Sequence, residues 1–360
     1  MDTSPPTFAS FTVPPADLLG IAARTDRRVR TLLDDELARW TGVDPLLADP
    51  LESLRSLVLA GGKRLRPAFC HWANVGAGGD PDSATVIDAG AGLELLHTFA
   101  LIHDDIMDGS LQRRGMAAVH VQFENQHREN GWRAEERRFG EGVAILVGDL
   151  AFVYADLLLT GVNPEAMAVY NELRVEVNIG QYLDLIGTAR GNPTVQSARR
   201  ICRYKSGKYT IERPLHLGAA LAGRLPEFSD SLSAYGLPLG EAFQLRDDLL
   251  GALGNEQLTG KPVGDDLREG KPTALVARAL ERATGAQLAV LDRIGHSDLS
   301  PAEIESLQHI FVETGAAKSV EEDINVLRDE AIAAMGASGL TKPATAALVE
   351  LAHFVTDRNY

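Results

Sequence analysis

LELLHTFALIHDDIMD, which spans residues 93–108, is the stretch on which the organisation of the chain depends. It is apolar and helix-like for about three turns and then presents three carboxylates, Asp104, Asp105 and Asp108. Side chains three and four positions apart are neighbours on a helix, so we expect the three carboxylates to converge on one face. A hard divalent cation relieves their mutual repulsion, and Mg²⁺ is typically held by one or two carboxylates plus substrate phosphates. The alternative is an ordinary acidic helix end in solvent.

The composition is that of a globular protein built from helices. Hydrophobic residues make up 45% of the 360 residues and aromatic residues only 6%, and alanine and leucine are abundant, which favours helices packed on helices. The formal net charge of −15 argues against a nucleic-acid partner, because a phosphate backbone requires a basic surface. Two isolated cysteines, Cys70 and Cys202, make no disulfide framework, so we expect a reducing, cytoplasmic location.

We expect one large domain without a membrane span. Residues 1–16 are rich in Pro, Ser and Thr and are predicted to be flexible, and residues 17–360 are predicted to form a single domain. The N-terminus lacks the pattern of a signal peptide, and nowhere do roughly 18 apolar residues follow one another as an integral membrane segment requires. Apolar residues recur at helical spacing, no alternating strand pattern is found, and residues 124–142 form a charged stretch that is predicted to be a surface excursion.

Two further motifs complement the first acidic helix. The loop GGKRLRP, residues 61–67, places Lys63 and Arg66 three positions apart, so the two cations can grip one anion, although a helix C-cap with solvated cations explains them equally. The stretch GEAFQLRDDLLG, residues 240–251, again presents paired carboxylates on an apolar helix. The two acidic helices therefore look like halves of one site.

These motifs, with RRG at residues 113–115 followed by His120, GQYLDL, YKSGKY and GKPVGDDLREGKP, stand in one order along the chain. Together they resemble the trans-isoprenyl diphosphate synthases, or polyprenyl synthetases, over roughly residues 55–280, and within them the short-chain geranylgeranyl diphosphate synthases. The resemblance implies an all-α isoprenoid synthase fold, in which mostly antiparallel helices surround a central cavity, and a homodimer. It implies a prenyltransferase that joins isopentenyl diphosphate head-to-tail to dimethylallyl, geranyl or farnesyl diphosphate.

Roles for individual residues follow from the same resemblance. The Mg²⁺ ligands are Asp104, Asp108 and Asp247, supported by Asp105; three ions with substrate bound are implied, and Mn²⁺ is an alternative ion. The allylic diphosphate is bound by Arg113, Lys205, Lys261 and Lys271. Isopentenyl diphosphate is bound by Lys63, Arg66, His97 and Arg114. Ser206 and Gln244 line the reacting carbon.

The residue types fit this chemistry independently of the family. A diphosphate leaves only when cations neutralise its developing charge, as Mg²⁺ with lysine and arginine can do. The allylic carbocation that remains must be shielded from water in an apolar cavity. The sequence offers no dedicated general base, and in the family the departed pyrophosphate takes the final proton.

Three positions depart from the family pattern. Gly251 stands where many members have a third aspartate, which weakens the second metal motif in principle. Met116-Ala117 replace a basic residue and a proline after RRG, so that loop is expected to close differently. Ser206 replaces a threonine but keeps its hydroxyl group.

Product length depends on what blocks the cavity below the first acidic motif. Helical geometry places Ala100 and Leu101 closer to the aspartate face than Phe99, so geometry alone does not select Phe99. The family pattern of one aromatic residue followed by a small one, Phe99-Ala100, resembles synthases of the twenty-carbon geranylgeranyl product. Plain core packing of Phe99 is the alternative.

Other readings remain open at this point. Within the same chemistry, the product is farnesyl diphosphate or a longer polyprenyl diphosphate. In another class, the chain is a non-catalytic subunit of a heteromeric prenyl synthase, which should have lost carboxylates or the Lys/Arg clamp. A terpene cyclase shares the first motif but carries a different second metal motif and does not need GGKRLRP.

Overall fold

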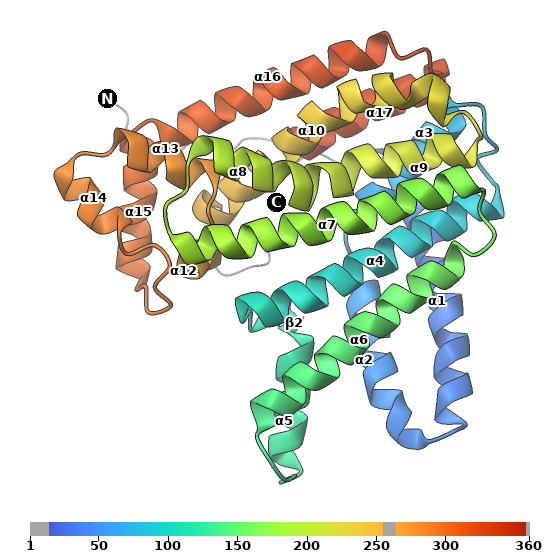
Figure 1. The fold of residues 1–360 in the computed structure, drawn as a ribbon, viewed down its shortest axis with the longest axis horizontal. Helices are drawn as coiled ribbons and strands as arrows, with labels where there is room; N and C mark the ends of the chain where they lie inside the picture. The colour runs from blue at the N-terminus through green and yellow to red at the C-terminus, as the bar shows by residue number, and fades with distance from the viewer. Residues whose placement is uncertain (1–13, 255–263, 358–360) are drawn as a thin grey trace.

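The computed structural model describes residues 14–254 and 264–357, and helices form nearly all of this part of the chain (Figure 1). The N-terminal helices are α1 (Ala16–Thr41), η1 (Pro45–Leu47), α2 (Ala48–Leu59), α3 (Leu65–Gly76), α4 (Ala84–Asp108), α5 (Val119–Glu129) and α6 (Glu136–Leu158). The central helices are α7 (Pro164–Arg190), α8 (Val195–Ile201), the π-helix η2 (Cys202–Glu212), α9 (Arg213–Leu221) and α10 (Leu225–Leu253). The C-terminal helices are α12 (Asp265–Glu269), α13 (Ala274–Arg282), α14 (Gly285–Leu291), α15 (Pro301–Glu313), α16 (Ala316–Gly336) and α17 (Lys342–Thr356). The all-α prediction is confirmed.

Long helices pack side by side around the segments that carry the motifs. In Figure 1, α7 runs alongside η2 and α9, α10 lies beside α16, and α6 crosses α4. Buried apolar residues form three clusters: one centred on α4 and α6, one on α3, α9, α10 and α17, and one on α10, α13, α15 and α16. Both acidic helices, α4 and α10, therefore pass through the packed core before they present their carboxylates.

Local signals fix where the helices begin and end. Helix α4 stops at Gly109, whose positive φ of 68° suits glycine and whose amide donates to the carbonyl of Asp105. Helix α7 starts with Asn163, whose side chain accepts a hydrogen bond from the Ala166 amide. Helix α15 starts with Ser300 and its reciprocal partner Glu303, as the sequence Ser-Pro-Ala-Glu predicts.

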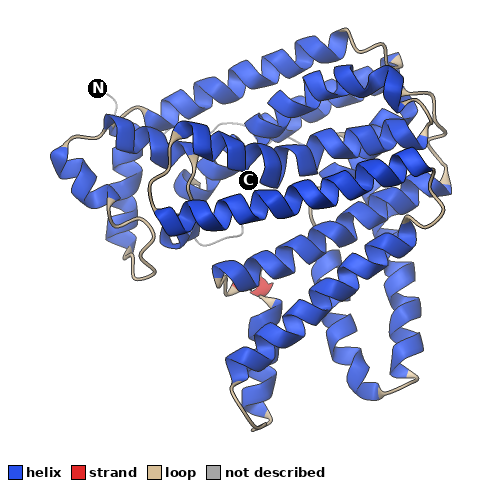
Figure 2. Ribbon diagram, viewed as in Figure 1, coloured by secondary structure: helices blue, strands red, loops and turns tan. Residues whose placement is uncertain are grey.

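The predicted surface excursion of residues 124–142 is formed mostly by the end of α5 and the start of α6, and the rings of His127, Trp132 and Phe139 meet there in edge-to-face and tilted contacts. One detail differs from the sequence-based expectations. Within the described residues, one antiparallel pair of strands also occurs, β1 (Gln112–Arg113) with β2 (Met116–Ala117), shown in red in Figure 2. The departure Met116-Ala117 thus closes the loop after RRG as a tight hairpin.

Helix α4 is the one described helix that is long and apolar enough to cross a membrane by length and composition. Its apolar window is 61% buried inside the fold. Buried acidic residues such as Glu94 and Asp105 also lie on it. A buried core helix of a soluble protein has the same length and composition.

The π-helix η2 is wedged between α7 and α10 at two glycines. A Cβ atom on Gly180 of α7 would lie 2.3 Å from the Lys205 amide nitrogen, and one on Gly240 of α10 would lie 2.6 Å from the Gly207 Cα atom. Both contacts involve backbone atoms, so a flexible side chain cannot move away to relieve them. The wider turns of a π-helix frequently mark functional sites, and this one carries the YKSGKY motif.

We predict that Gly180→Ala lowers the free energy of unfolding by about 1–3 kcal/mol, the usual result of overpacking, and displaces Lys205. Gly142→Ala is the matched control, because a Cβ atom on that helical glycine would meet nothing within 4 Å, and alanine there should stabilise by ~0.5–1 kcal/mol. Chemical denaturation of both variants checks this. Equal stabilities for the two variants would contradict the close packing at Gly180.

Candidate active site

A cavity of about 410 Å³ lies between α4, α7, η2, α10 and the loop before α3. The structure brings most of the residues predicted from the sequence to its wall. They are Lys63, Arg66, His97, Ala100, Asp104, Arg113, Arg114, Lys205, Ser206, Gln244 and Asp247. Predicted residues that are more than a hundred positions apart in the chain thus share one pocket.

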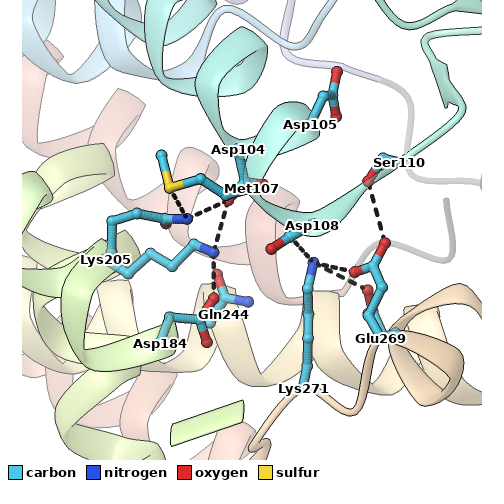
Figure 3. A network of polar contacts seen from close by, with 12 residues as sticks. Asp104, Asp105, Met107, Asp108, Ser110, Asp184, Lys205, Gln244, Glu269 and Lys271 are labelled. Atoms are coloured by element: carbon cyan, nitrogen blue, oxygen red, sulfur yellow. Dashed lines mark hydrogen bonds and ion pairs between the residues drawn. The ribbon is translucent and has the colours of Figure 1, made fainter. Parts of the chain in front are cut away.

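Lys205 links three helices at the acidic end of this pocket (Figure 3). Its Nζ atom donates to Asp104 Oδ1 at 3.0 Å and to Asp184 Oδ2 at 2.5 Å, and Gln181 Nε2 also donates to Asp104 Oδ1 at 2.8 Å. Burial alone would raise the pKa of Asp104, but Lys205 and the neighbouring cations hold that pKa at about 2. Asp104 is therefore ionised at neutral pH.

Lys271 makes a second cluster beside the first. Its Nζ atom lies 2.8 Å from Glu269 Oε2, 3.3 Å from Asp108 Oδ2 and 3.6 Å from Asp266 Oδ1. Burial and the charge of Asp104 raise the pKa of Asp108 to about 6. Lys205 and Lys271 together offset the electrostatic repulsion among these closely spaced carboxylates.

Asp105 does not share the face of Asp104 and Asp108, so the expected convergence of all three is wrong. Figure 3 shows its side chain pointing away from the other two, and its Oδ1 atom accepts a 2.8 Å hydrogen bond from Arg113 Nε. The reason is geometric, since consecutive helical residues lie about 100° apart around the axis. Asp105 is buried and holds the Arg113 guanidinium at the pocket wall, 3.8 Å from Asp104 Oδ2.

The donor set fits magnesium held jointly by protein and substrate. In residues 14–254 and 264–357, no three His, Cys, Asp or Glu side chains form a ready-made metal cluster. Mg²⁺ usually takes one or two carboxylates plus substrate phosphates, so a protein-only cage is not required. Asp108 Oδ2 is buried, accepts no hydrogen bond within the same ranges and lies 3.3 Å from Lys271 Nζ, so a magnesium ion bound there would neutralise the carboxylate beside that ammonium or in its place.

Helix α10 supplies the second acidic motif. Asp247 lines the pocket, and Asp248 accepts a 2.7 Å hydrogen bond from Gln244 Nε2. Burial raises the pKa of Asp248 to about 8, against the opposing effect of Gln244. A Cβ atom at Gly251 would lie 2.1 Å from Asp266 Oδ2. The carboxylate of Asp266 thus occupies the space that a third aspartate at position 251 would need.

The basic loop before α3 is held by one arginine that the sequence did not single out. Arg64 has a left-handed φ of 48° and is buried, and it donates to Glu94 at 2.6 Å, to Asp26 at 2.7 Å and to the Val58 carbonyl at 2.6 Å. These bonds anchor the loop on α1, α2 and α4. Lys63, on the same loop, is thereby placed at the pocket wall.

Arg66 and His97 meet at the basic end of the pocket through Tyr209. Arg66 donates to Thr210 Oγ1 at 2.8 Å, and its guanidinium lies 4.2 Å from the centre of the Tyr209 ring. His97 Nδ1 lies 3.1 Å from the Tyr209 hydroxyl. Burial, and then Arg66 and Arg114, hold the pKa of His97 well below its usual value, so the imidazole is neutral. His97 therefore belongs to the site rather than to an isolated apolar core.

Comparison with known proteins identifies this arrangement. A model of the polyprenyl synthetase family matches residues 48–311, which is wider at both ends than the motifs alone indicated. The chain belongs to the polyprenyl synthetase family. It is therefore a prenyltransferase with the isoprenoid synthase fold, as the motifs predicted.

The chain is similar to several known proteins, including the following three. Geranylgeranyl pyrophosphate synthase from Corynebacterium glutamicum, complexed with isoprenyl diphosphate and magnesium, superposes with a TM-score of 0.88 at 38% identity, covering 93% of this chain and 98% of that one. Geranylgeranyl diphosphate synthase from Methanosarcina mazei is 31% identical over 92% of this chain and 99% of the relative. Geranylfarnesyl diphosphate synthase from Aeropyrum pernix is 35% identical over 74% of this chain and 80% of the relative.

In this polyprenyl synthetase the two predicted chain-length residues have different surroundings. Ala100 and Leu101 line the pocket, as helical geometry predicted. The ring of Phe99 packs instead against His103 and Phe152, with ring centres 4.6 Å and 4.9 Å apart. Phe99 is thus part of a contact between α4 and α6.

Several residues of the site escaped the sequence analysis, and one predicted residue, Lys261, lies outside the described part of the chain. Gln181 and Asp184 belong to the quoted GQYLDL motif, and their i,i+3 spacing on α7 was the available signal. Tyr209 closes the quoted YKSGKY motif. Asp266 belongs to the quoted GKPVGDDLREGKP motif, but its approach to Gly251 had no signal in the sequence, because only the fold brings the two together.

We predict that Gly251→Asp, which restores the aspartate of many family members, lowers prenyltransferase activity by roughly tenfold instead of raising it, because Asp266 must shift to admit the new side chain and the two carboxylates repel each other. Steady-state kinetics across magnesium concentrations check this. Gly336→Asp on α16, where a Cβ atom would meet nothing within 4 Å, is the matched control. An increase in activity for Gly251→Asp would show that Asp266 does not occupy the third position.

Proposed function

We propose that the enzyme adds isopentenyl diphosphate to dimethylallyl, geranyl and farnesyl diphosphate and releases geranylgeranyl diphosphate. The observation that carries this proposal is the distribution of charge around the active-site pocket. Asp104 and Lys205 contact each other on a wall that also includes Asp247. Arg66 packs on Tyr209 beside His97, about two turns before Asp104 on α4, and Lys63 and Arg114 also line the pocket. An acidic, metal-binding end suits an allylic diphosphate, and a basic end suits a second diphosphate without metal.

Residue roles in the proposed reaction are carried over from the family resemblance. Asp104, Asp108 and Asp247 would hold Mg²⁺, with three ions and Mn²⁺ as an alternative carried over from the family resemblance. Magnesium supplies neutralisation of the negative charge that develops on the leaving diphosphate. Lys205, with Lys261, Lys271 and Arg113, adds cations around the same diphosphate.

At the other end, the clamp Lys63, Arg66, His97 and Arg114 is proposed to orient isopentenyl diphosphate. His97 is neutral, so it contributes a hydrogen bond and not a charge. Ser206 and Gln244 line the pocket and are proposed to face the carbon at which the new carbon–carbon bond forms. The proton lost after bond formation passes to the departed pyrophosphate in this proposal, since His97 lies by the second substrate and is already engaged with Tyr209.

The twenty-carbon product is supported by the relatives and by the α4–α6 contact. The structural neighbour from Corynebacterium glutamicum and the relative from Methanosarcina mazei are geranylgeranyl synthases. The Aeropyrum pernix relative is a geranylfarnesyl synthase, so a longer product is the alternative within the same chemistry. Phe99, which directly precedes Ala100 on α4 and packs on Phe152, is proposed to stop growth of the chain.

The other classes of function fit the pocket less well. A non-catalytic subunit should lack carboxylates or cations that are present here. A terpene cyclase takes one diphosphate and gives no reason for Lys63, Arg66 and Arg114 to gather at the same cavity.

We also propose that residues 17–360 act as one catalytic domain, in the cytoplasm, as a homodimer. Support for a dimer comes from exposed apolar side chains on neighbouring helices: Leu146, Val153 and Leu157 on α6 are 63%, 51% and 55% exposed, and Val175, Ile179 and Tyr182 on α7 are 53%, 48% and 65% exposed. Apolar stripes of this kind are typical of subunit interfaces.

The test of the proposed function uses the purified chain with labelled isopentenyl diphosphate and each allylic diphosphate, with and without Mg²⁺. We expect extension to the twenty-carbon diphosphate with Mg²⁺ and none after its removal. Hydrocarbon without chain extension would instead identify a cyclase, and turnover only after addition of a partner chain would identify a subunit.

For product length, we predict that Phe99→Ala raises the share of products longer than twenty carbons, because the smaller side chain opens the contact with Phe152. Chromatography of the dephosphorylated products measures the shift. Phe139→Ala, which alters a ring of the α5–α6 cluster that does not line the pocket, serves as the control. An unchanged product distribution for Phe99→Ala would contradict the proposed role of Phe99 in limiting product length.

For assembly, we predict that Val153→Glu converts the dimer to monomers in sedimentation equilibrium, because a charge would be buried at the interface. Val326→Glu on α16 changes a valine of similar exposure, 66%, away from the α6–α7 face. Dissociation by both variants, or by neither, would argue against an interface on α6.

A further inference from the structure

One face of α7 continues past the residues that line the pocket. Tyr170, Arg174, Val177 and Gln181 recur at helical spacing and so lie on one side of the helix. Gln181 and Val177 line the pocket, whereas Arg174 and Tyr170 lie beyond it, progressively farther from Asp104. An arginine therefore stands one turn below the last α7 residue of the pocket wall, in the direction in which a hydrocarbon chain would grow.

Arg174 is held there by both polar and aromatic contacts. Its Nη1 atom lies 2.8 Å from each carboxylate oxygen of Asp156 on α6. Its guanidinium carbon lies 5.1 Å from the centre of the Phe152 ring and 4.6 Å from that of Tyr170. Tyr170 is fully buried and Arg174 is mostly buried, with 20% of its side chain exposed. The flat guanidinium is thus fixed between an acid and two rings.

The Phe152 ring on α6 also contacts Phe99 on α4, with ring centres 4.9 Å apart. The contacts therefore run in series from α4 to α7, through Phe99, Phe152, Arg174 and Tyr170. Movement of Phe152 away from Phe99 would open the contact between their rings, and the guanidinium of Arg174 lies against the same Phe152 ring. A residue of α7, away from the acidic motif, is therefore in contact with the partner of Phe99.

We propose that Arg174 is a positioning residue for product length, which holds Phe152 against Phe99 and so sets where chain growth stops. This inference rests on the proposed synthase function and deepens it. The chemistry requires arginine, because a planar guanidinium can pair with a carboxylate and stack on rings at the same time, whereas a lysine ammonium cannot do both. Asp156 acts through Arg174 by fixing the plane of its guanidinium.

A purely structural role, in which Arg174 only ties α6 to α7, predicts a different result. Loss of such a tie would lower stability and leave the product unchanged. Loss of the positioning role changes the product distribution, which helix tethering alone does not control. Product length and not stability is therefore the deciding readout.

The experiment compares the parent enzyme, Arg174→Ala, Arg174→Lys and Asp156→Asn in the presence of farnesyl diphosphate, labelled isopentenyl diphosphate and Mg²⁺. We expect Arg174→Ala to raise the ratio of longer products to the twenty-carbon product by roughly fivefold, the effect of losing one cation–π contact. Asp156→Asn and Arg174→Lys should give intermediate ratios. Arg137→Ala, which breaks an exposed i,i+4 pair with Glu141 on α6, is the matched control and should leave the ratio unchanged.

A double variant tests whether Arg174 acts through Phe99. If the two residues act in series, Phe99→Ala with Arg174→Ala shifts the ratio by less than the product of the single effects. A parent-like ratio for Arg174→Ala, at a stability that keeps it folded, would overturn the inference; if that variant does not fold, Asp156→Asn decides in its place. Absence of any chain extension by the parent enzyme would refute the proposed function, which separates the two failures.

Discussion

The site depends above all on the contact of Lys205 with Asp104 and Asp184. These three residues come from η2, α4 and α7, so a single ammonium group ties three helices at the acidic end of the pocket. All three side chains are largely buried. Removal of one partner from a buried ion pair typically lowers the free energy of unfolding by about 3–5 kcal/mol, because the remaining charge is neither paired nor hydrated. The position of Lys205 depends in turn on Gly180, which allows the backbone of η2 to approach α7. A contact between backbone atoms thus determines the electrostatics of the pocket.

The remaining carboxylates show that this region is built for a bound cation and not for stability alone. Burial raises the pKa of Asp248 to about 8 and, with Asp104, that of Asp108 to about 6. Both groups ionise near 4 in an unfolded chain, so the folded chain binds more protons between those values and loses stability as the pH rises through them. A cation at this position offsets that loss. Sites that are strained in this way are common where binding has been selected over stability.

The sequence predicted the helices and most of the pocket because both depend on local patterns. The spacing of Asp104 and Asp108, the Ser300–Glu303 cap and the blocks around Lys63 and Lys205 could all be read along the chain. The prediction for Asp105 was wrong. Its spacing of three residues from Asp108 suggested a shared face, but its rotation of about 100° from Asp104 around the helix axis turns it away. The contacts of Asp266 with Gly251 and of Arg174 with Phe152 could not be predicted, since each pair becomes neighbours only through packing between helices. Local sequence motifs therefore predicted the residues at the centre of the site, whereas the contacts around it depend on tertiary packing.

Donor capacity explains how Lys205 can serve both the fold and the reaction. A lysine ammonium has three N–H donors, and in the described chain this one donates to the carboxylates of Asp104 and Asp184. One donor therefore stays available while both helix contacts are kept, and Lys205 lines the pocket where the allylic diphosphate is proposed to bind. Substrate binding then needs no rupture of the bridge that organises the three helices. The same ammonium can hold the fold in place while the negative charge on the leaving group increases, which is when a fixed cation contributes most to the rate.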